Sequence, residues 1–226
     1  MIALENLRYR WNPEEPVVLG IDEFSIDDGE RVFVEGPSGC GKTTLLDVLS
    51  GIAAVDMGLV TVRGRNLTAM TASERDAFRA DNVGVIFRMF NLLPYLSMIE
   101  NVTLPCRFSG PRKQRATRAA VSIEAEAKRL LGRMGLSAET SRPVSRLSVG
   151  QQQRVAAARA LIGAPELVVA DEPTSALDGD ARNAFIDLLL EECRESGATL
   201  VFVSHDTGLA NQFDRGVSLP EINRAL

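Results

Sequence analysis

The stretch Gly36-Pro37-Ser38-Gly39-Cys40-Gly41-Lys42-Thr43-Thr44 decides what kind of fold this chain adopts. It fits the pattern G-x-x-x-x-G-K-[ST], it follows a short apolar run from Arg31 to Glu35, and it leads into a helical pattern at Leu45 to Leu49. A strand before the motif and a helix after it distinguish a phosphate-binding loop from a chance glycine-rich turn. The sequence therefore predicts a nucleotide site at this loop.

Each part of the loop has a predicted task. The glycines let backbone N–H groups turn inward around phosphate oxygens, and the helix N-terminus adds a partial positive charge. Lys42 is expected to reach the β- and γ-phosphates, and the hydroxyl of Thr43 to bind Mg²⁺. Cys40 is interpreted as an inert small side chain, the alternative being a thiol whose oxidation impairs nucleotide binding. The predicted nucleotide-binding residues of the loop are Gly36, Pro37, Ser38, Gly39, Cys40, Gly41, Lys42, Thr43 and Thr44.

A second apolar run, Leu167 to Ala170, ends in the carboxylates Asp171 and Glu172. Two acids after a strand are common at protein surfaces, but a phosphate-binding loop earlier in the chain gives them a role. Asp171 is expected to bind Mg²⁺, directly or through water. Glu172 is expected to polarise an attacking water as general base.

The apolar runs predict an α/β fold with a parallel sheet. Leu167 to Ala170 and Thr199 to Val203 are continuous and rich in valine, which suits strands buried on both faces. A helical pattern from Ala181 to Arg194 lies between them, and strand, helix and strand in this order imply parallel pairing. Further elements are predicted as strands at Met1 to Leu7, Val60 to Val62 and Asn82 to Phe87, and as a helix from Ala72 to Ala80 that begins at a capping box, Thr71 to Glu74.

The middle of the chain reads as a helical insertion into this sheet. We expect one domain over residues 1–226, with a core formed by 1–87 and 165–226 and a helical subdomain at about 88–164. One apolar helix face is marked by Ile123, Ala127, Leu130, Leu131 and Met134. The basic run Arg112, Lys113, Arg115 and Arg118 is interpreted as a solvated helix face, with a lipid-headgroup or partner contact as the alternative.

Composition excludes several classes of protein. The net charge is −5 and the pI about 5.1, whereas a nucleic-acid binder usually carries a basic excess. No stretch approaches the roughly 18 to 20 apolar residues that span a bilayer, and Met1 to Arg10 lacks the apolar centre of a signal peptide. We expect a cytoplasmic protein that meets a membrane only through a partner. Disulfide and zinc frameworks are not expected, because the cysteines number three and lie far apart, at Cys40, Cys106 and Cys193.

Three further motifs narrow the class of nucleotide-binding protein. Leu147 to Arg154 reads L-S-V-G-Q-Q-Q-R, Asp171 to Asp178 reads D-E-P-T-S-A-L-D, and Val203 to Asp206 reads V-S-H-D. They resemble the signature, the Walker B and D-loop run, and the switch-histidine motif of the ABC (ATP-binding cassette) ATPases. With the phosphate loop they stand in that family's order, and the resemblance covers about Ile2 to Leu219.

The resemblance implies a RecA-like, P-loop NTPase core with a parallel sheet, an antiparallel β subdomain and an inserted helical subdomain. It also implies a homodimer that binds ATP between the phosphate loop of one copy and the signature of the other. Ser148 and Gly150, with Gln151 in the same motif, are then expected at the γ-phosphate in trans. His205 is expected at the same phosphate, and Asp178 between the two sites. Among aromatic residues near the N-terminus, Trp11 is expected to stack on adenine, with Tyr9 as the alternative.

The segment Phe90 to Ser97 and the triplet Glu100 to Val102 look like the lipoprotein-release, macrolide-export and cell-division (FtsE-like) ATPases. This implies an ATPase on the cytoplasmic face of the inner membrane that drives an export or extraction permease of the FtsX or MacB type. The alternative is a motor that transmits force through an FtsX-type partner without transport. A third class, the ABC ATPases of DNA repair or translation, is disfavoured because they carry insertions that this acidic single cassette lacks.

Two residues depart from the family pattern. Val149 stands at the first glycine of the signature. Arg88 stands where the family has a glutamine that senses Mg²⁺ and the attacking water. A guanidinium has donors only, so it lacks the carbonyl oxygen that glutamine offers a metal, and it repels Mg²⁺. Arg88 is therefore expected either to turn away or to contact phosphate and alter turnover.

The segment Met89 to Met98 after it is unusually apolar for a loop beside a nucleotide site. It is predicted to line a groove for a short permease helix, as in related transporters. The alternative is that it packs into the helical subdomain.

Overall fold

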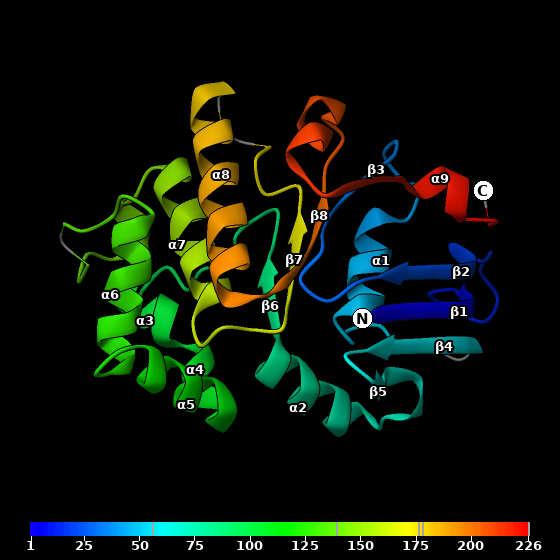
Figure 1. The fold of residues 1–226 in the computed structure, drawn as a ribbon, viewed down its shortest axis with the longest axis horizontal. Coiled ribbons are helices and arrows are strands. Elements are labelled where there is room, and N and C mark those ends of the chain that lie inside the picture. Colours follow the sequence, from blue (N-terminus) through cyan, green and yellow to red (C-terminus); the bar gives the residue numbers. More distant parts are fainter. Residues whose placement is uncertain (56, 139, 176, 178, 226) are drawn as a thin grey trace. The chain divides into compact units, whose positions relative to one another are not determined.

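The computed structural model describes residues 1–55, 57–138, 140–175, 177 and 179–225. The chain forms two compact units (Figure 1). Unit 1 comprises Met1–Arg79, Val169–Asp171 and Thr199–Leu226, and unit 2 comprises Ala80–Val168 and Glu172–Ala198. The predicted core and helical subdomain, with boundaries near residues 88 and 164, remain a prediction.

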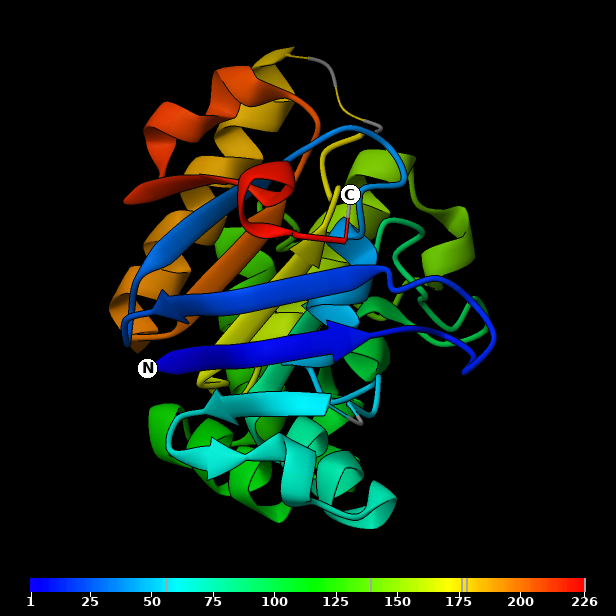
Figure 2. The same cartoon turned by 90° about the vertical axis from the view of Figure 1, so that its right-hand side faces the viewer.

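The first sheet of unit 1 is antiparallel, with the order β2-β1-β4-β5 (Figure 2). Leu4 of β1 lies opposite both Phe24 of β2 and Val60 of β4, and all three side chains are buried. This places one apolar row in the core of the unit. The strands are β1 (Ile2–Tyr9), β2 (Leu19–Ile26), β4 (Met57–Val62) and β5 (Arg65–Asn66).

The second sheet has the order β6-β7-β8-β3-β9. Strand β3 pairs in parallel with β8 on one side and with β9 on the other. The central strands are apolar except at their ends, and Phe33 of β3 and Phe202 of β8 stack with their ring centroids 6.1 Å apart. The strands are β3 (Arg31–Glu35), β6 (Val83–Ile86), β7 (Leu167–Asp171), β8 (Thr199–Val203) and β9 (Arg215–Ser218).

Five helical elements lie wholly or mostly in the described part of unit 1. Helix α1 (Lys42–Leu49) follows the phosphate-binding loop and packs against β4 and β8. Helix α2 (Ala72–Asn82) begins at the predicted capping box, in which Glu74 accepts a hydrogen bond from the Thr71 backbone and Thr71 accepts one from Glu74. The other elements are the short helices η1 (Leu67–Ala69), η3 (Thr207–Gln212) and α9 (Leu219–Ile222).

Unit 2 is mainly helical, and α7 lies between α6 and α8 (Figure 1). Four of the five residues of the predicted apolar face are buried, namely Ala127, Leu130, Leu131 and Met134, and Ile123 is half-buried. The helical elements are α3 (Met98–Thr103), α4 (Pro105–Phe108), α5 (Gly110–Ala119), α6 (Ile123–Arg133), η2 (Val144–Arg146), α7 (Val149–Leu161) and α8 (Gly179–Ser196).

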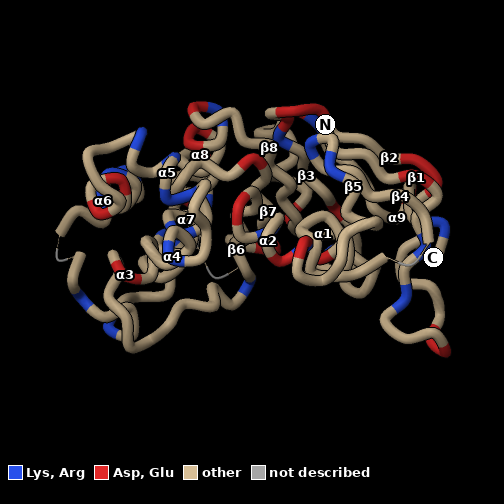
Figure 3. Tube along the Cα trace, turned by 90° about the horizontal axis from the view of Figure 1, so that it is seen from below, with Lys and Arg blue, Asp and Glu red and all other residues tan. Residues whose placement is uncertain are grey.

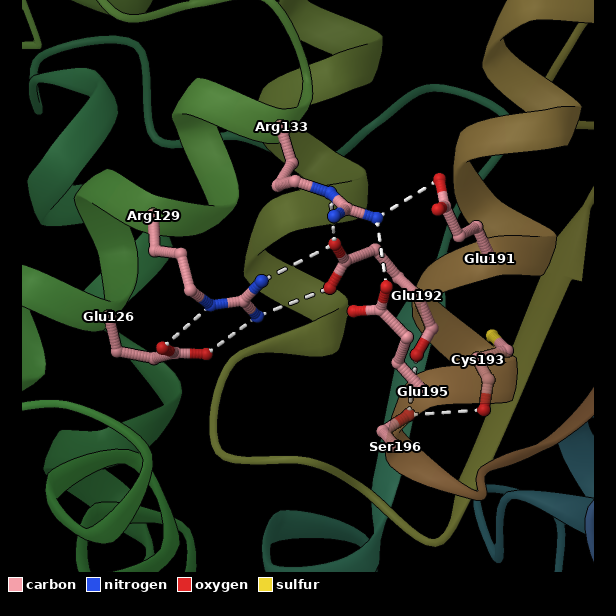
Figure 4. Close-up of polar contacts among 8 residues, drawn as sticks. All are labelled: Glu126, Arg129, Arg133, Glu191, Glu192, Cys193, Glu195 and Ser196. Carbon is pink, nitrogen blue, oxygen red and sulfur yellow. Dashed lines mark hydrogen bonds and ion pairs between the residues drawn. The ribbon is translucent and has the colours of Figure 1, made fainter.

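An ion-pair network joins α6 to α8, with Glu192 at its centre (Figure 4). Glu192 is only 4% exposed at its side chain, and it contacts Arg129 at 3.2 Å and Arg133 at 2.9 Å. Arg129 also binds Glu126 at 3.0 Å, and these carboxylates raise its pKa. Carboxylates of α8 are thus held by guanidinium groups of α6, while elsewhere charges of both signs are spread along the chain (Figure 3).

The predicted solvated face of the basic run is wrong for two of its four residues. Arg112 is 3% exposed and donates to the carbonyls of Ile162 at 3.0 Å, Val83 at 3.2 Å and Ala160 at 2.5 Å. Arg115 donates to the carbonyl of Gly163 at 2.6 Å. The carbonyls at the C-terminal end of α7 have no partner within the helix, so buried donors from α5 satisfy them.

Burial of the guanidinium lowers the pKa of Arg112 to about 10. Lys113 and Arg118 are exposed, as predicted.

Candidate nucleotide-binding site

The phosphate-binding loop connects β3 to α1, as the motif predicts. Gly41 caps the N-terminus of α1 with φ 101°, a region that side chains disfavour. A Cβ at this position would also lie 2.9 Å from Cδ2 of Leu19. Both constraints require glycine, and they direct the N-terminal N–H groups of α1 toward the loop. A phosphate group suits such a helix terminus.

Lys42 lies across the loop that contains it. Its ammonium group donates to the carbonyls of Gly36 at 2.7 Å and Pro37 at 2.9 Å, and the residue is only 7% exposed. These acceptors are neutral, so a phosphate oxygen is a stronger partner for the ammonium group. The side chain is therefore held where an anion in the loop would meet it. Cys40, two residues before Lys42, is buried.

The two predicted metal ligands come together. The hydroxyl of Thr43 donates to Oδ2 of Asp171 at 2.9 Å, and Asp171 ends β7. Burial and then the charge of Asp171 raise the pKa of the nearby Asp47. Oxygen donors of this kind fit Mg²⁺, which is usually bound by one or two protein groups together with water and phosphate. Among the residues described, no group of three or more His, Cys, Asp or Glu is placed to hold a metal ion.

His205 follows β8 by two residues, at the same edge of the sheet as the phosphate-binding loop. Val203 of β8 lies opposite Val34 of β3 in parallel register, so both chains leave the sheet at their carboxyl ends. The backbone N–H of Ser204 donates to the carbonyl of Val34 at 3.2 Å. This holds the segment before His205 beside the strand that leads into the loop.

Tyr9 and Trp11 line a cavity of about 510 Å³ in unit 1. Their ring centroids are 5.2 Å apart in an edge-to-face arrangement. Tyr9 is buried, whereas Trp11 is 52% exposed and presents ring surface to solvent. Both residues weighed from the sequence therefore line one cavity, and Trp11 has the more accessible face for an adenine ring. The other lining residues are Arg8, Arg10, Pro13, Val17 and Met57.

The signature residues form the N-terminus of α7 in unit 2. Ser148 is the N-cap, and its hydroxyl accepts a hydrogen bond from the backbone of Gln151. The side chain of Gln151 accepts one in return from the backbone of Ser148 at 3.0 Å. Val149 is 50% exposed, so the departure from glycine places no side chain in the core. At Gly150 a Cβ would lie 3.2 Å from Leu177, which leaves little room for a larger residue.

Glu172 follows β7 in a strained backbone conformation, with φ 42°. Its side chain is 12% exposed and forms an ion pair with Arg88, in which Nη1 and Oε2 lie 3.5 Å apart. Arg88 is 61% exposed at its side chain. The guanidinium thus faces the predicted base, and the two outcomes expected for Arg88, turning away or contacting phosphate, stay predictions. Asp178 lies outside the described residues.

The comparisons with known proteins agree with these motifs. The family model described as ABC transporter matches residues 19–175. The chain belongs to the ABC transporter ATP-binding family. An uncharacterised ABC transporter ATP-binding protein of Mycobacterium tuberculosis is 38% identical over 99% of this chain and 91% of its own length. The lipoprotein-releasing system ATP-binding protein LolD of Bacteroides fragilis is 36% identical over 99% of both chains.

Solved structures are similar to this ABC ATPase along most of the chain. The dimeric post-hydrolysis structure of the ATP-binding cassette MJ0796, bound to ADP and Pi, has a TM-score of 0.84 at 33% identity. It covers 96% of this chain and 94% of the other. The predicted P-loop fold with an antiparallel β subdomain is thereby confirmed, as is the assignment as an ATP-binding ATPase.

In this ABC ATPase the apolar segment from Met89 to Met98 is held by hydrogen bonds to two polar side chains. Arg159 of α7 donates to the carbonyls of Phe90 and Asn91, each at 2.6 Å. Asn101 is fully buried and receives a hydrogen bond from the backbone of Leu93 at 2.9 Å. Phe90 is buried, but Tyr95 is 75% exposed. The segment thus has a packed base and an exposed ring at Tyr95, and the groove for a permease helix stays a prediction.

Sequence reasoning missed Asn223, which braces the phosphate-binding loop. This buried amide donates to the carbonyls of Val18 at 2.9 Å and Cys40 at 3.3 Å, and it accepts from the backbone of Gly20 at 2.8 Å. It ties the loop to β2 from about 180 residues away in sequence. No local pattern marks such a residue, because an asparagine near a chain end resembles any polar surface residue.

Proposed function

We propose that this ABC ATPase binds Mg-ATP at the phosphate-binding loop of unit 1 and hydrolyses it to ADP and phosphate. The contact between Thr43 and Asp171 carries this proposal, because it joins two oxygen donors 128 positions apart at the loop that holds Lys42. Mg²⁺ would be held by these two residues and would neutralise charge on the phosphates. Trp11 is assigned to adenine, with Tyr9 supporting its ring.

Hydrolysis requires a water aligned for attack on the γ-phosphorus and a group that takes its proton. Glu172 is proposed as that base, since it directly follows the proposed metal ligand Asp171 and its carboxylate is mostly buried. His205 is proposed to contact the γ-phosphate, because it leaves the sheet at the same edge as the loop. The bond between the γ-phosphorus and the β–γ bridging oxygen breaks, and the bridging oxygen stays on ADP. The phosphate that leaves carries the oxygen of the attacking water.

The second proposal is an ATP-dependent homodimer. Ser148, Gly150 and Gln151 at the N-terminus of α7 would approach the γ-phosphate bound by the other copy, where backbone N–H groups and the helix dipole favour an anion. The solved dimeric structure of MJ0796 in a post-hydrolysis state supports this arrangement. Asp178 is proposed to link the two sites.

The substitution Glu172→Gln tests both proposals. It removes the base but keeps size and hydrogen bonding, so ATP binding is expected to persist while hydrolysis falls by about a hundredfold or more. Sedimentation with ATP is expected to show an accumulated dimer. Lys42→Met is the matched control, because it should weaken ATP binding and leave a monomer. A Glu172→Gln protein that binds ATP normally but stays monomeric would contradict the sandwich arrangement.

The third proposal is a membrane permease of the FtsX or MacB type as partner, in an export or extraction system. The names of the LolD relatives as lipoprotein-releasing support it. In the described chain no helix is both long and apolar enough to cross a bilayer. The ATPase would then work at the cytoplasmic face of the inner membrane through its permease. A force-transmitting complex without transport is the alternative, and the architecture of a co-purifying membrane partner would decide between them.

The exposed tip at Tyr95 is the proposed docking point for that partner, with Leu92 beside it. Tyr95→Ala is expected to abolish stimulation by the permease while basal ATPase activity and thermal stability persist, because the ring is 75% exposed. Phe108→Ala, at an equally exposed ring on α4, is the matched control. Unchanged stimulation in the Tyr95 variant would place the docking surface elsewhere.

A further inference from the structure

The ion pair between Arg88 and Glu172 has a direct bearing on the rate of hydrolysis. Nη1 of Arg88 and Oε2 of Glu172 are 3.5 Å apart. Arg88 follows β6 by two residues, and Glu172 follows β7 directly, so two neighbouring strands deliver the two charges. Both residues belong to unit 2, within which their separation is defined.

The contact pairs an exposed guanidinium with a nearly buried carboxylate. Within the part of the chain that is described, the ion pair is the one polar contact of the Arg88 side chain. Glu172 has φ 42°, and its carbonyl accepts a hydrogen bond from the backbone of Ser175 at 3.2 Å, so a tight turn holds its backbone. A backbone in this uncommon region persists only where its surroundings hold it. The backbone that carries the carboxylate is therefore held in place, and Arg88 pairs with that carboxylate.

A guanidinium at this oxygen opposes the work of a general base. A base must offer a carboxylate oxygen to the water it activates, and the N–H groups of Arg88 compete for Oε2. Glutamine, which the family resemblance leads us to expect at this position, carries no charge and competes for Oε2 more weakly.

We propose that Arg88 is a positioning residue that holds the carboxylate of Glu172 through this ion pair and thereby slows ATP hydrolysis. The proposal rests on the function proposed above for Glu172. Arg88 acts on turnover and not on nucleotide affinity, because its side chain contacts the base. Since Arg88 is 61% exposed, salt screens the pair and relieves the restraint.

A charge series at position 88 tests the proposal. Arg88→Met removes the charge and offers no oxygen, Arg88→Gln removes the charge and adds a carbonyl oxygen, and Arg88→Lys keeps the charge. Arg118→Gln, on the exposed side of α5, is the control for net charge. The readouts are kcat and KM for ATP at low and high salt, together with the thermal unfolding midpoint.

The Met and Gln variants are both expected to raise kcat by about two- to fivefold at low salt, which is the range for one exposed ion pair. KM for ATP and the unfolding midpoint should stay close to those of the parent. Arg88→Lys and Arg118→Gln should keep the parent rate. High salt should raise kcat of the parent toward that of the Met variant. The kcat of the Met variant itself should stay at its low-salt value or fall below it.

Two results would overturn the inference. If Arg88→Gln is faster but Arg88→Met equals the parent, the missing carbonyl oxygen matters and the cation does not. If Arg88→Met still raises the residual rate in a Glu172→Gln background, Arg88 does not act through Glu172. Failure of the proposed function is separate, because Glu172→Gln would then hydrolyse ATP at the parent rate.

Discussion

The contact between Gly84 of β6 and the C-terminal end of α7 predicts a large effect from adding one methyl group. A Cβ at position 84 would lie 2.3 Å from the carbonyl oxygen of Ala160 and 2.9 Å from its carbon. Cβ atoms essentially never approach closer than 3.0 Å, so Gly84→Ala must separate strand and helix by at least 0.7 Å. Both contacting atoms are backbone, and no side-chain rotation relieves the clash.

The cost has two parts. Overpacking a close contact typically costs about 1–3 kcal/mol. The same carbonyl of Ala160 accepts a hydrogen bond from the buried guanidinium of Arg112 at 2.5 Å, and a charge-assisted bond of this kind contributes about 1.5–3 kcal/mol. A shift of the carbonyl weakens that bond as well. We therefore expect Gly84→Ala to lower the free energy of unfolding by about 3–5 kcal/mol, although it adds only one carbon atom.

Thermal unfolding measures this effect. For a chain of this length each kcal/mol corresponds to roughly 2–4 °C, so the midpoint should fall by roughly 6–20 °C. Gly132→Ala in α6 is the matched control, because its Cβ would meet only Oγ of Ser137 at 3.5 Å, an ordinary contact. Removing a glycine from a helix should raise stability by about 0.5–1 kcal/mol. Equal midpoints for the two variants would refute the steric reasoning.

Three further predictions concern other contacts. Trp11→Ala should raise the Kd for ATP by about tenfold, since base stacking contributes about 1–3 kcal/mol; calorimetric titration checks this, and unchanged affinity would assign adenine elsewhere. Glu192→Gln should lower the free energy of unfolding in urea by about 1–2 kcal/mol, because it removes the 4% exposed carboxylate that pairs with both Arg129 and Arg133. An unchanged urea midpoint would show that the network does not stabilise the fold. Hydrogen bonds from Ser97 lower the pKa of Glu100, so its stabilising effect should be lost as pH falls below about 4.3, and Glu100→Gln should flatten that acid limb of stability.

Much of the sheet is predictable because its strands carry their own signals. The runs at Arg31–Glu35 and Thr199–Val203 are strands with the predicted bounds. Strand β2 (Leu19–Ile26) was not predicted, because Asp22 and Glu23 interrupt its alternation, and its regular antiparallel pairing with β1 is a non-local contact. The local sequence pattern thus identifies buried strands, but it misses a partly exposed strand whose conformation depends on pairing with neighbouring strands.

The same distinction separates what could be predicted about the site. Thr43 and Asp171 could be paired from the sequence because each belongs to a contiguous motif, and both motifs are expected to bind the same Mg²⁺. Arg112 could not be recognised as buried, since its partners are carbonyls about 50 residues away that have no residue-specific signature. The ion pair of Arg88 with Glu172 is a non-local contact of the same type. The sequence shows that Arg88 replaces the expected glutamine, but the partner of Arg88 can be identified only from the fold.

Helix α7 connects these observations within unit 2. It has 13 residues, a length at which an isolated helix is marginally stable in water, so its position depends on contacts at both ends. Its N-terminus carries Ser148 in a capping box, and its C-terminal carbonyls are held by Arg112 and touched by Gly84 of β6. Strand β6 continues within two residues to Arg88. A displacement of β6 would therefore reach the signature through α7 and Glu172 through Arg88, so one strand is in a position to affect both the proposed dimer contact and the proposed base.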